Sequence, residues 1–518
     1  MKWTCNLVRI GQVKLALNGK KSVILHKIYR YSMQRIALLA VSALTCLTSW
    51  AITTVETKPG KLATLVTDHS ITALKVRGEM DARDFKFIAE NLDSLSEIDL
   101  SEATITAYSN SEMAVLGADN NFAAASIPCT SFFGKPITSI ALPASLKSIG
   151  YAAFAGCEKL TEITFPSQLD SIGSYAFSSS GITSVVLPAT VRVVGDGAFS
   201  RCGKLTSAKV GSASIGKEAF YADTALSALT LEKSVEVVGD GAFKACTALE
   251  SLQIEGSAIK SIGEEAFAST SMAELDLSAQ SSLGSIGGWA LANTPITSAK
   301  LPKSATDMGD GAFFYATKLE DATLPDSLTA VPAYTFAGAK ALTSATGHYI
   351  PATAQELGDF SFYNACAIQG FTIPKSINRI GTKAMAGMTG LQTIVAYSES
   401  SVPELADSVW AGVDQTSVNL DVKTTVLAEK FAATAQWQDF HILKDYLLGD
   451  VNSDGALDVA DVSLLVSYIL GNDPSPFATN LADTNSDGIV DVSDVSTLIN
   501  MVLSGDTVVI RRTPRANP

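Results

Sequence analysis

The sequence predicts a repeat solenoid built from short parallel β-strands, followed by a small all-α domain, and so belongs to the α/β repeat fold class. Three observations lead to this prediction. An apolar motif recurs about every 23 residues through most of the chain, and such a period is typical of solenoids. The chain has 518 residues, which exceeds what a single hydrophobic core supports. Two aspartate-rich loops near the end of the chain have the residue spacing of a calcium site.

Residues 1–51 form a basic leader, which we expect to be a signal peptide. They carry eight Lys or Arg and no Asp or Glu, so their removal changes the formal net charge from −14 to −22. The apolar run 36–47 follows a basic segment and precedes small residues, as in a secretory signal, with Met33 as the expected start. An uncleaved anchor, or a lipid on Cys46, is an alternative. We therefore expect a secreted or cell-surface protein with no membrane span in the mature chain.

Residues 52–126 are expected to cap the array. The segment 71–76 has the pattern of a strand, and Asp81 is a plausible helix N-cap before apolar residues at helical spacing. The terminal unit of a solenoid must cover the open end of the core, which explains an atypical strand and helix here. Residues 103–126 are expected to form a polar loop.

Residues 127–416 form the array itself. Each repeat has an apolar alternation, which predicts a strand with one buried face, and in many repeats a proline ends that strand. A glycine follows, which we expect to permit a turn. Four residues after the glycine, an inward-pointing residue is expected in the core. This core slot is held by Phe154, Phe177, Phe199, Phe220, Phe243, Phe267, Leu291, Phe313, Phe336, Phe362, Met385 and Trp410.

One unit of the array, ITSIALPASLKSIGYAAFAGCEKL at residues 137–160, resembles the leucine-rich repeats of BspA-like bacterial surface proteins. The resemblance extends over residues of roughly 70 to 440. It implies a curved leucine-rich-repeat solenoid with one short parallel strand per repeat. BspA-like proteins are associated with adhesion to host proteins or to other cells, so the resemblance implies a host-protein or glycan ligand on the solenoid.

Three cysteines, Cys157, Cys202 and Cys246, each lie three residues after the core slot. They are two repeats apart, whereas a disulfide needs Cα atoms within about 7 Å. We therefore expect them to be small buried hydrophobic residues. No CxxC pair is present, so zinc and thioredoxin chemistry have no support.

Residues 417–449 interrupt the period and are expected to form a C-terminal cap with a strand, a helix over 425–437 and a second strand. No Pro-rich or Ser-rich linker follows this cap, so the next domain is expected to abut the solenoid. That domain covers residues 450–505, and residues 506–518 are expected to be a tail.

Residues 450–505 contain nine Asp and no Glu, Lys or Arg. Eight of these Asp fall in two copies of D-x-N-x-D-G-x-x-D-x-x-D, at 450–461 and 483–494. Positions 1, 3, 5, 9 and 12 present side-chain oxygens, position 7 a carbonyl, and the glycine at position 6 a sharp turn, as in calcium loops. Zinc would need His or Cys, which neither loop has. The predicted ligands of two Ca²⁺ ions are Asp450, Asn452, Asp454, Ala456, Asp458 and Asp461, and Asp483, Asn485, Asp487, Ile489, Asp491 and Asp494.

A helix with an apolar stripe is expected after each loop, and the two stripes are expected to pack on each other. The stripes are Val462, Leu465, Val466, Ile469 and Leu470, and Val495, Leu498, Ile499, Val502 and Leu503. With no helix predicted before either loop and Asp rather than Glu at position 12, the domain resembles a type I dockerin. The resemblance implies calcium-dependent folding and docking to a cohesin-bearing protein. Loop positions 10 and 11, which the resemblance assigns to the partner surface, are Val459, Ala460, Val492 and Ser493.

The remaining features favour a binding protein over an enzyme. An acidic exported chain lacks the basic footprint that nucleic acid requires. No GxSxG motif is present, and the GDGAF segments lack a phosphate-loop pattern, so we interpret them as turns of the repeat. The histidines outside the leader are scattered at His69, His348 and His441. Two alternatives stay open: an accessory component of a dockerin–cohesin polysaccharide-degrading complex, and a glycoside hydrolase with its carboxylate pair hidden in residues 103–126.

Overall fold

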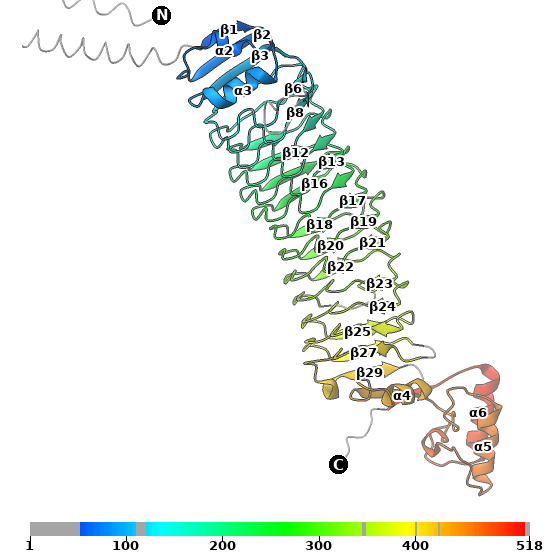
Figure 1. Ribbon diagram of the computed structural model, residues 1–518. Coiled ribbons are helices and arrows are strands. Elements are labelled where there is room, and N and C mark those ends of the chain that lie inside the picture. The colour runs from blue at the N-terminus through cyan, green and yellow to red at the C-terminus, as the bar shows by residue number, and fades with distance from the viewer. Residues whose placement is uncertain (1–51, 110–120, 344–348, 399–400, 423–424, 513–518) are drawn as a thin grey trace, which may run out of the picture.

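The computed structural model describes residues 52–109, 121–343, 349–398, 401–422 and 425–512. The expected signal peptide lies outside the described residues, so it stays a prediction. Figure 1 shows a long rod of stacked repeats with a small helical domain beside its C-terminal end. The predicted parallel-strand solenoid followed by a small helical domain is confirmed.

The N-terminal cap contains a short parallel sheet covered by a helix (Figure 1). Asp81 is the N-cap of the helix, as predicted, because its side chain accepts from the Arg83 N–H while Asp84 reaches back to the Asp81 N–H. The sheet continues into the first repeat through β7, so the cap closes the core by extending it. The elements are β1 (Thr53–Thr57), α2 (Leu62–Leu65), β2 (Ala73–Met80), α3 (Ala82–Asn91), β3 (Glu97–Ile105), and the antiparallel pair β4 (Tyr108–Ser109) and β5 (Asn121–Phe122).

Most repeats place a first strand in one row along the rod, and the row is divided into four separate sheets. Neighbouring strands in this row are parallel and in register, with buried and exposed side chains alternating, as the sequence pattern predicts. The row consists of β7 (Ser139–Ala141), β10 (Ser184–Val186), β12 (Ser207–Val210), β14 (Ala228–Leu231), β16 (Ser251–Ile254), β18 (Glu274–Asp276), β20 (Ser298–Lys300), β22 (Asp321–Thr323), β25 (Gly370–Ile373), β27 (Thr393–Ala396) and β29 (Asn419–Val422).

A second row of two-residue strands runs beside the first, so that most repeats contribute two strands where the sequence pattern gave only one. The first nine form one continuous parallel sheet. The row consists of β6 (Ser126–Ile127), β8 (Ser148–Ile149), β9 (Ser171–Ile172), β11 (Val193–Val194), β13 (Ser214–Ile215), β15 (Val237–Val238), β17 (Ser261–Ile262), β19 (Ser285–Ile286), β21 (Asp307–Met308), β23 (Ala330–Val331), β24 (Glu356–Leu357), β26 (Arg379–Ile380) and β28 (Glu404–Leu405).

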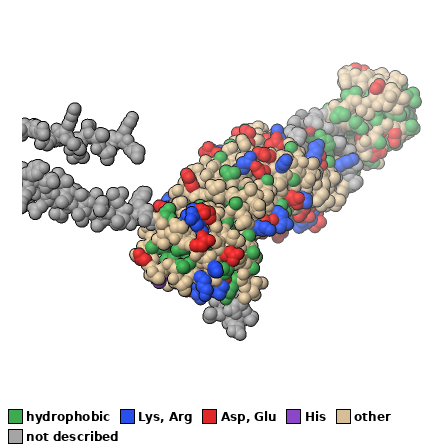
Figure 2. Space-filling model, turned by 90° about the horizontal axis from the view of Figure 1, so that it is seen from above, with side chains coloured by type: hydrophobic (Ala, Val, Ile, Leu, Met, Phe, Trp, Pro, Cys, Tyr) green, Lys and Arg blue, Asp and Glu red, His purple; other side chains and the backbone are tan. Residues whose placement is uncertain are grey.

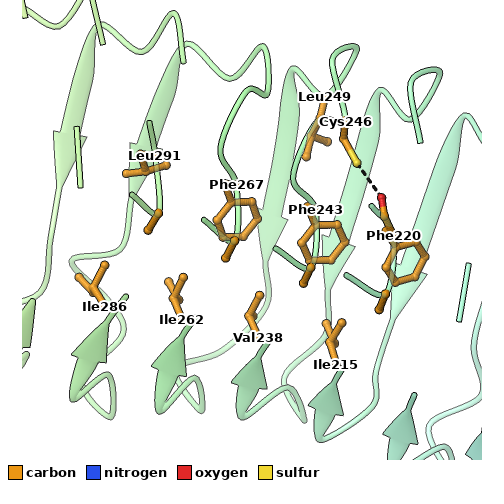
Figure 3. Packing of buried hydrophobic residues seen from close by; sticks show 14 of the residues in the cluster. Ile215, Phe220, Val238, Phe243, Cys246, Leu249, Ile262, Phe267, Ile286 and Leu291 are labelled. Carbon is orange, nitrogen blue, oxygen red and sulfur yellow. Dashed lines mark hydrogen bonds between the residues drawn. The ribbon is translucent and has the colours of Figure 1, made fainter. Parts of the chain in front are cut away.

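The core slot is buried along the whole array, as predicted. Phe220 and Phe243 stack with ring centroids 5.2 Å apart, and Phe243 and Phe267 follow at 5.5 Å. Figure 3 shows these rings in one row that Leu291 continues, above a second row formed by Ile215, Val238, Ile262 and Ile286 from the two-residue strands. Burial of each aromatic side chain contributes roughly 1.5–3 kcal/mol. The spine therefore makes the rod one continuous core.

The repeat glycines are needed for close packing between coils. A Cβ on Gly150 would lie 2.7 Å from the Cys129 nitrogen and 2.8 Å from the Ile127 oxygen, so no side chain fits. The left-handed backbone of the turn lies two residues later, at Ala152 and Tyr175 for example. We had expected the glycine to permit the turn, and the structure corrects this: glycine allows neighbouring coils to approach.

Cys157, Cys202 and Cys246 are buried and form no disulfide, as predicted. Cys246 Sγ donates to the Phe220 carbonyl of the preceding repeat at 3.1 Å (Figure 3), and Cys202 makes the same contact with Phe177. Burial raises the pKa of the Cys157 and Cys202 thiols to about 12, so both are neutral. These hydrogen bonds connect neighbouring repeats through the core.

The C-terminal cap has the predicted order of strand, helix and strand. The row ends with β29, α4 (Thr425–Ala432) covers the core, and β30 (His441–Leu447) extends the sheet, with a 3-10 turn η2 (Gln415–Ser417) before β29. The helix is shorter than the predicted 425–437, because turns replace it after Ala432. The expected tail contains one further strand, β31 (Val509–Arg512), which pairs antiparallel with β30. The description of 506–518 as a tail is therefore wrong for Val509–Arg512, because the sheet edge left open by β30 accepts that strand.

Candidate calcium-binding and partner-docking domain

The two aspartate-rich loops have the same internal geometry. In the first, Asp450 accepts from the N–H groups of Asp454 (Oδ1, 3.1 Å) and Gly455 (Oδ2, 3.0 Å). In the second, Asp483 accepts from Asp487 at 3.1 Å and Gly488 at 2.9 Å. Gly455 and Gly488 have φ values of +88° and +89°, a conformation that glycine adopts without strain. The shared residue spacing therefore produces the same sharp turn in both loops.

The last Asp of each loop closes it onto the following helix. Asp461 accepts from the N–H groups of Asn452 (3.2 Å) and Asp458 (3.0 Å), and Asp494 does the same for Asn485 (3.1 Å) and Asp491 (2.8 Å). Asp458 and Asp491 are the N-caps of the helices, each in a reciprocal capping box with the Asp three residues on. The loops therefore start α5 (Val459–Ile469) and α6 (Val492–Ser504), which flank a short 3-10 turn η3 (Thr479–Leu481).

The residues of the loops fit a calcium ion. The carboxylates face backbone N–H groups, and among the described residues no three His, Cys, Asp and Glu side chains form a ready-made metal cluster. The donor set is nevertheless oxygen only, and calcium loops also use an amide and a main-chain carbonyl, which Asn452 and Ala456 can supply. Burial raises the pKa of the Asp450 and Asp461 carboxyl groups, and nearby carboxylates add to the shift. A cation would offset both effects.

The predicted ligands Asp483, Asp487, Asp491 and Ile489 lie in the second loop, where Ile489 at position 7 is exposed. The Ser493 hydroxyl and N–H both donate to Asp491, and these bonds lower the pKa of that carboxyl. In each loop the predicted ligand positions thus extend from the sharp turn to the first turn of the following helix.

The two helices pack on each other through only part of their apolar stripes. Leu465 and Leu498 are fully buried together with Val451 and Ala482. Leu470 and Leu503, which we expected in the same contact, are 75% and 80% exposed. That part of the packing prediction is wrong because the contact uses one side of each stripe and leaves the other side open.

The open sides form equivalent stripes on the two helices. The partner residues predicted at loop positions 10 and 11, Val459, Ala460, Val492 and Ser493, are all exposed. Each stripe begins at the Val of loop position 10 and continues at the residues 7 and 11 positions later. The sequence pattern predicted these later residues in the contact between the helices, so it did not indicate the exposed stripes. The apolar members are Val459, Val466 and Leu470 on α5, and Val492, Ile499 and Leu503 on α6.

The helical domain is attached to the rod through two adjacent strands. The chain enters after β30 and returns as β31, and the Leu448 N–H donates to the Val508 carbonyl at 2.8 Å where they separate. Gly449 lies against Leu457 and Leu498 of the domain core, where a Cβ would not fit. Both ends of the domain are therefore held at the end of the solenoid sheet, in agreement with the absence of a linker.

Features that could have indicated other functions have structural roles. Asp240 of a GDGAF segment accepts from the Glu264 N–H of the next repeat at 2.9 Å, and Asp310 does the same for Ala333. His69 packs edge-on against Phe87, His441 begins β30, and His348 lies outside the described residues. Acidic and basic side chains are interspersed along the face shown in Figure 2. In the described part of the chain, no helix combines the length and hydrophobicity of a membrane span.

A rod of leucine-rich coils that ends in a paired-loop helical domain defines the class of protein. Residues 125–221, 213–343 and 312–436 match the BspA type leucine rich repeat region, and residues 448–503 match the dockerin type I domain. Since the repeat matches cover more than half of the chain, it belongs to the BspA-type leucine-rich repeat family and carries a C-terminal dockerin. Calcium binding follows from the dockerin domain. Both modules are non-catalytic and typical of extracellular or cell-surface proteins.

One solved structure agrees on the fold, and two others are similar chains. A leucine-rich repeat protein from Bacteroides ovatus is similar with a TM-score of 0.56 and 19% identity, over 75% of this chain and 92% of that chain. A leucine-rich repeat protein from Eubacterium ventriosum has 24% identity and a TM-score of 0.30, over 43% of this chain and 70% of that chain. A leucine rich cell surface protein from Faecalibacterium prausnitzii has 19% identity and a TM-score of 0.28, over 57% and 87%. No curated protein matches the chain significantly.

Proposed function

We propose that this protein is an exported, non-catalytic binding protein. Its dockerin domain binds two Ca²⁺ ions, one in each loop, and attaches the chain to a cohesin-bearing partner. Its solenoid recognises a protein or a glycan at the cell surface. The proposed ion ligands are the twelve loop positions predicted from the sequence, because both loops turn the same oxygen donors into the same geometry.

The observation that carries the attachment role is the pair of exposed apolar stripes. Val459 and Val492 are 69% and 68% exposed, and each begins a stripe that runs along its helix. Exposed apolar residues in contiguous patches mark interaction sites, and a folded domain this small has little reason to leave so many of them in water. A cohesin-type partner, which the dockerin match implies, would cover them.

The solenoid offers an extended surface for a second ligand. An open groove of about 670 Å³ follows the two-residue strands β13 to β21. It is lined by hydroxyl groups and apolar side chains from successive coils, including Ser214, Val237 and Ser261, and by the charged residues Lys217 and Asp240. Such a groove supports recognition of an extended ligand, while the core residues of the repeat build only the rod.

The experiment is a pull-down from extracellular fractions of the source organism with the full chain, in calcium and in EDTA. Recovery of a cohesin-bearing partner in calcium, lost in EDTA, supports the proposal. Leu470→Lys with Leu503→Lys should abolish that recovery, whereas Asp473→Asn, an exposed position of the same domain outside both loops, should not. Equal recovery in EDTA would contradict calcium-dependent attachment.

The same experiment separates the alternative role. Co-recovery of polysaccharide-degrading enzymes through the cohesin-bearing partner favours an accessory component of such a complex, and calcium-independent binding of host protein favours adhesion. A glycan-release assay with the purified chain tests the hydrolase alternative, and turnover there would contradict the non-catalytic assignment.

A further inference from the structure

The two calcium loops differ at position 11, and this difference changes the hydrogen bonds that hold their ligand side chains in place. Loop 1 has Ala460 at this position and loop 2 has Ser493. Ser493 Oγ donates to Asp491 Oδ1 at 2.6 Å and accepts from Asn485 Nδ2 at 2.8 Å. One hydroxyl thus joins the ligand residues at positions 3 and 9 of its loop. Ala460 has no side-chain hydroxyl and cannot connect these positions in loop 1. Its N–H donates to Asp458, just as the N–H of Ser493 donates to Asp491.

The consequence is clearest for the asparagine. A cation needs the amide oxygen, and an amide turned the other way would present its N–H groups instead. In both loops Oδ1 accepts from the N–H of the position-5 Asp, at 2.9 Å for Asn452 and 2.8 Å for Asn485. The bond from Nδ2 to Ser493 fixes this orientation from the outer side of loop 2.

In loop 1 the hydrogen bond that holds the asparagine amide uses a carboxylate that the ion would also need. Within the described part of the chain, Asn452 Nδ2 donates to Asp454 Oδ2 alone, at 2.7 Å, and Asp454 is itself a proposed ligand. When that carboxylate turns toward a cation, the amide loses its partner. Asn485 makes the equivalent bond to Asp487 at 2.9 Å and keeps Ser493 as well.

We propose that Ser493 is a positioning residue for calcium that makes loop 2 the tighter of the two sites. This inference rests on the proposed calcium sites. A ligand set already held in its binding conformation loses less conformational freedom when the ion arrives, and affinity rises accordingly. Thr484 acts in the same direction, because its hydroxyl donates to the Asp494 carbonyl at 2.8 Å, where loop 1 has Val451. The ions therefore bind in sequence, loop 2 before loop 1.

Calorimetric calcium titration of the full chain tests this. The wild type should show one tight and one weaker site. Ser493→Ala should weaken the tight site about five-fold, the size expected for one hydrogen bond, and leave the weaker site unchanged. Ser493→Thr keeps the hydroxyl and should retain the affinity. Ala460→Ser should strengthen the weaker site. Ser496→Ala is the control, because that hydroxyl bonds only to the Val492 carbonyl of its own helix.

The outcomes separate the inference from the function on which it rests. Two ions bound equally by wild type and Ser493→Ala would overturn the inference and leave the calcium sites standing. Weakening of the weaker site by Ser493→Ala would also overturn it. A wild-type chain that binds no calcium would contradict the proposed function itself. An unchanged melting temperature of the solenoid in Ser493→Ala should accompany the expected result, because the substitution lies outside that core.

Discussion

The solenoid and the dockerin domain maintain their folds in opposite ways. The solenoid has one hydrophobic cluster that runs from Leu62 to Ile442 without a break. The dockerin has a hydrophobic cluster with four buried members, Val451, Leu465, Ala482 and Leu498, and leaves comparable residues exposed. A core this small rarely stabilises a domain without an additional constraint such as a bound metal ion. The rod should therefore be stable without calcium, and the dockerin should depend on it.

The two regions also treat buried carboxyl groups differently. In the dockerin, Asp450 and Asp461 are buried where a cation would neutralise them. In the rod, Asp223 is fully buried at the slot that holds Cys202 and Cys246 in neighbouring repeats. One of its oxygens accepts from the Cys202 N–H at 2.7 Å, and the other has no partner. The first arrangement is a site for an ion, and the second is a local weakness of the rod.

The largest expected effect is the loss of the dockerin fold. Asp454→Ala with Asp487→Ala removes one ligand from each loop, so calcium should no longer order residues 450–505. Hydrogen exchange in calcium should show those amides exposed while the repeats stay protected. Asp473→Ala, which removes one carboxylate of the same domain outside both loops, should exchange like the wild type. Full protection of the double variant would refute the metal sites.

Next in size is the spine of the rod. Phe243→Ala removes a fully buried ring in mid-array and should destabilise the solenoid by about 3–5 kcal/mol. Denaturant unfolding followed by far-UV circular dichroism measures the change. Phe133→Ala is the control, since that ring is 62% exposed and should cost little. Equal effects of the two substitutions would show that the assigned register does not describe the core.

Asp223 should make the stability of the rod depend on pH. Burial raises the pKa of this carboxyl well above its usual value, and the thiols of Cys202 and Cys246 beside it are kept neutral by their own burial. The folded state therefore holds the proton more tightly than the unfolded state. Its stabilising effect is complete below the unfolded pKa of about 3.9 and is lost as pH rises toward the folded pKa.

Asp223→Asn removes this proton linkage. Above about pH 4 the variant should become more stable than the wild type by about 1.4 kcal/mol for each pH unit, up to the folded pKa, because only the wild type must keep a proton that its unfolded state has released. Unfolding curves across that range measure the difference. Asp223→Cys, which installs the residue of the neighbouring repeats, should behave in the same way. A difference independent of pH would mean that Asp223 does not titrate in the folded rod.

The smallest effect concerns the junction. Ile510→Pro removes an N–H from β31, which pairs with Tyr446 of β30, and should cost about 1 kcal/mol. Exchange of the β30 amides should accelerate, and small-angle scattering should show a broader range of positions for the dockerin. Thr507→Pro, just before the strand, serves as the control. Unchanged β30 protection in Ile510→Pro would contradict attachment through two strands.

The sequence predicts those parts of the structure that repeat. The core slot could be assigned because Phe154 and its equivalents recur at a fixed interval, and the loops because each supplies its own ligands at fixed spacing. β31 could not be predicted, because its partner β30 lies about sixty residues earlier and no local pattern connects them. The exposed side of α5 was missed because periodicity identifies apolar residues such as Leu470 but not the surface that covers them.

Scanning calorimetry of the full chain, with calcium and with excess EGTA, tests the central comparison most directly. We expect two transitions in calcium, of which EGTA removes the one that belongs to the dockerin and leaves the solenoid transition at the same temperature. A single transition that shifts as a whole on chelation would contradict the account, because the rod itself would then depend on calcium.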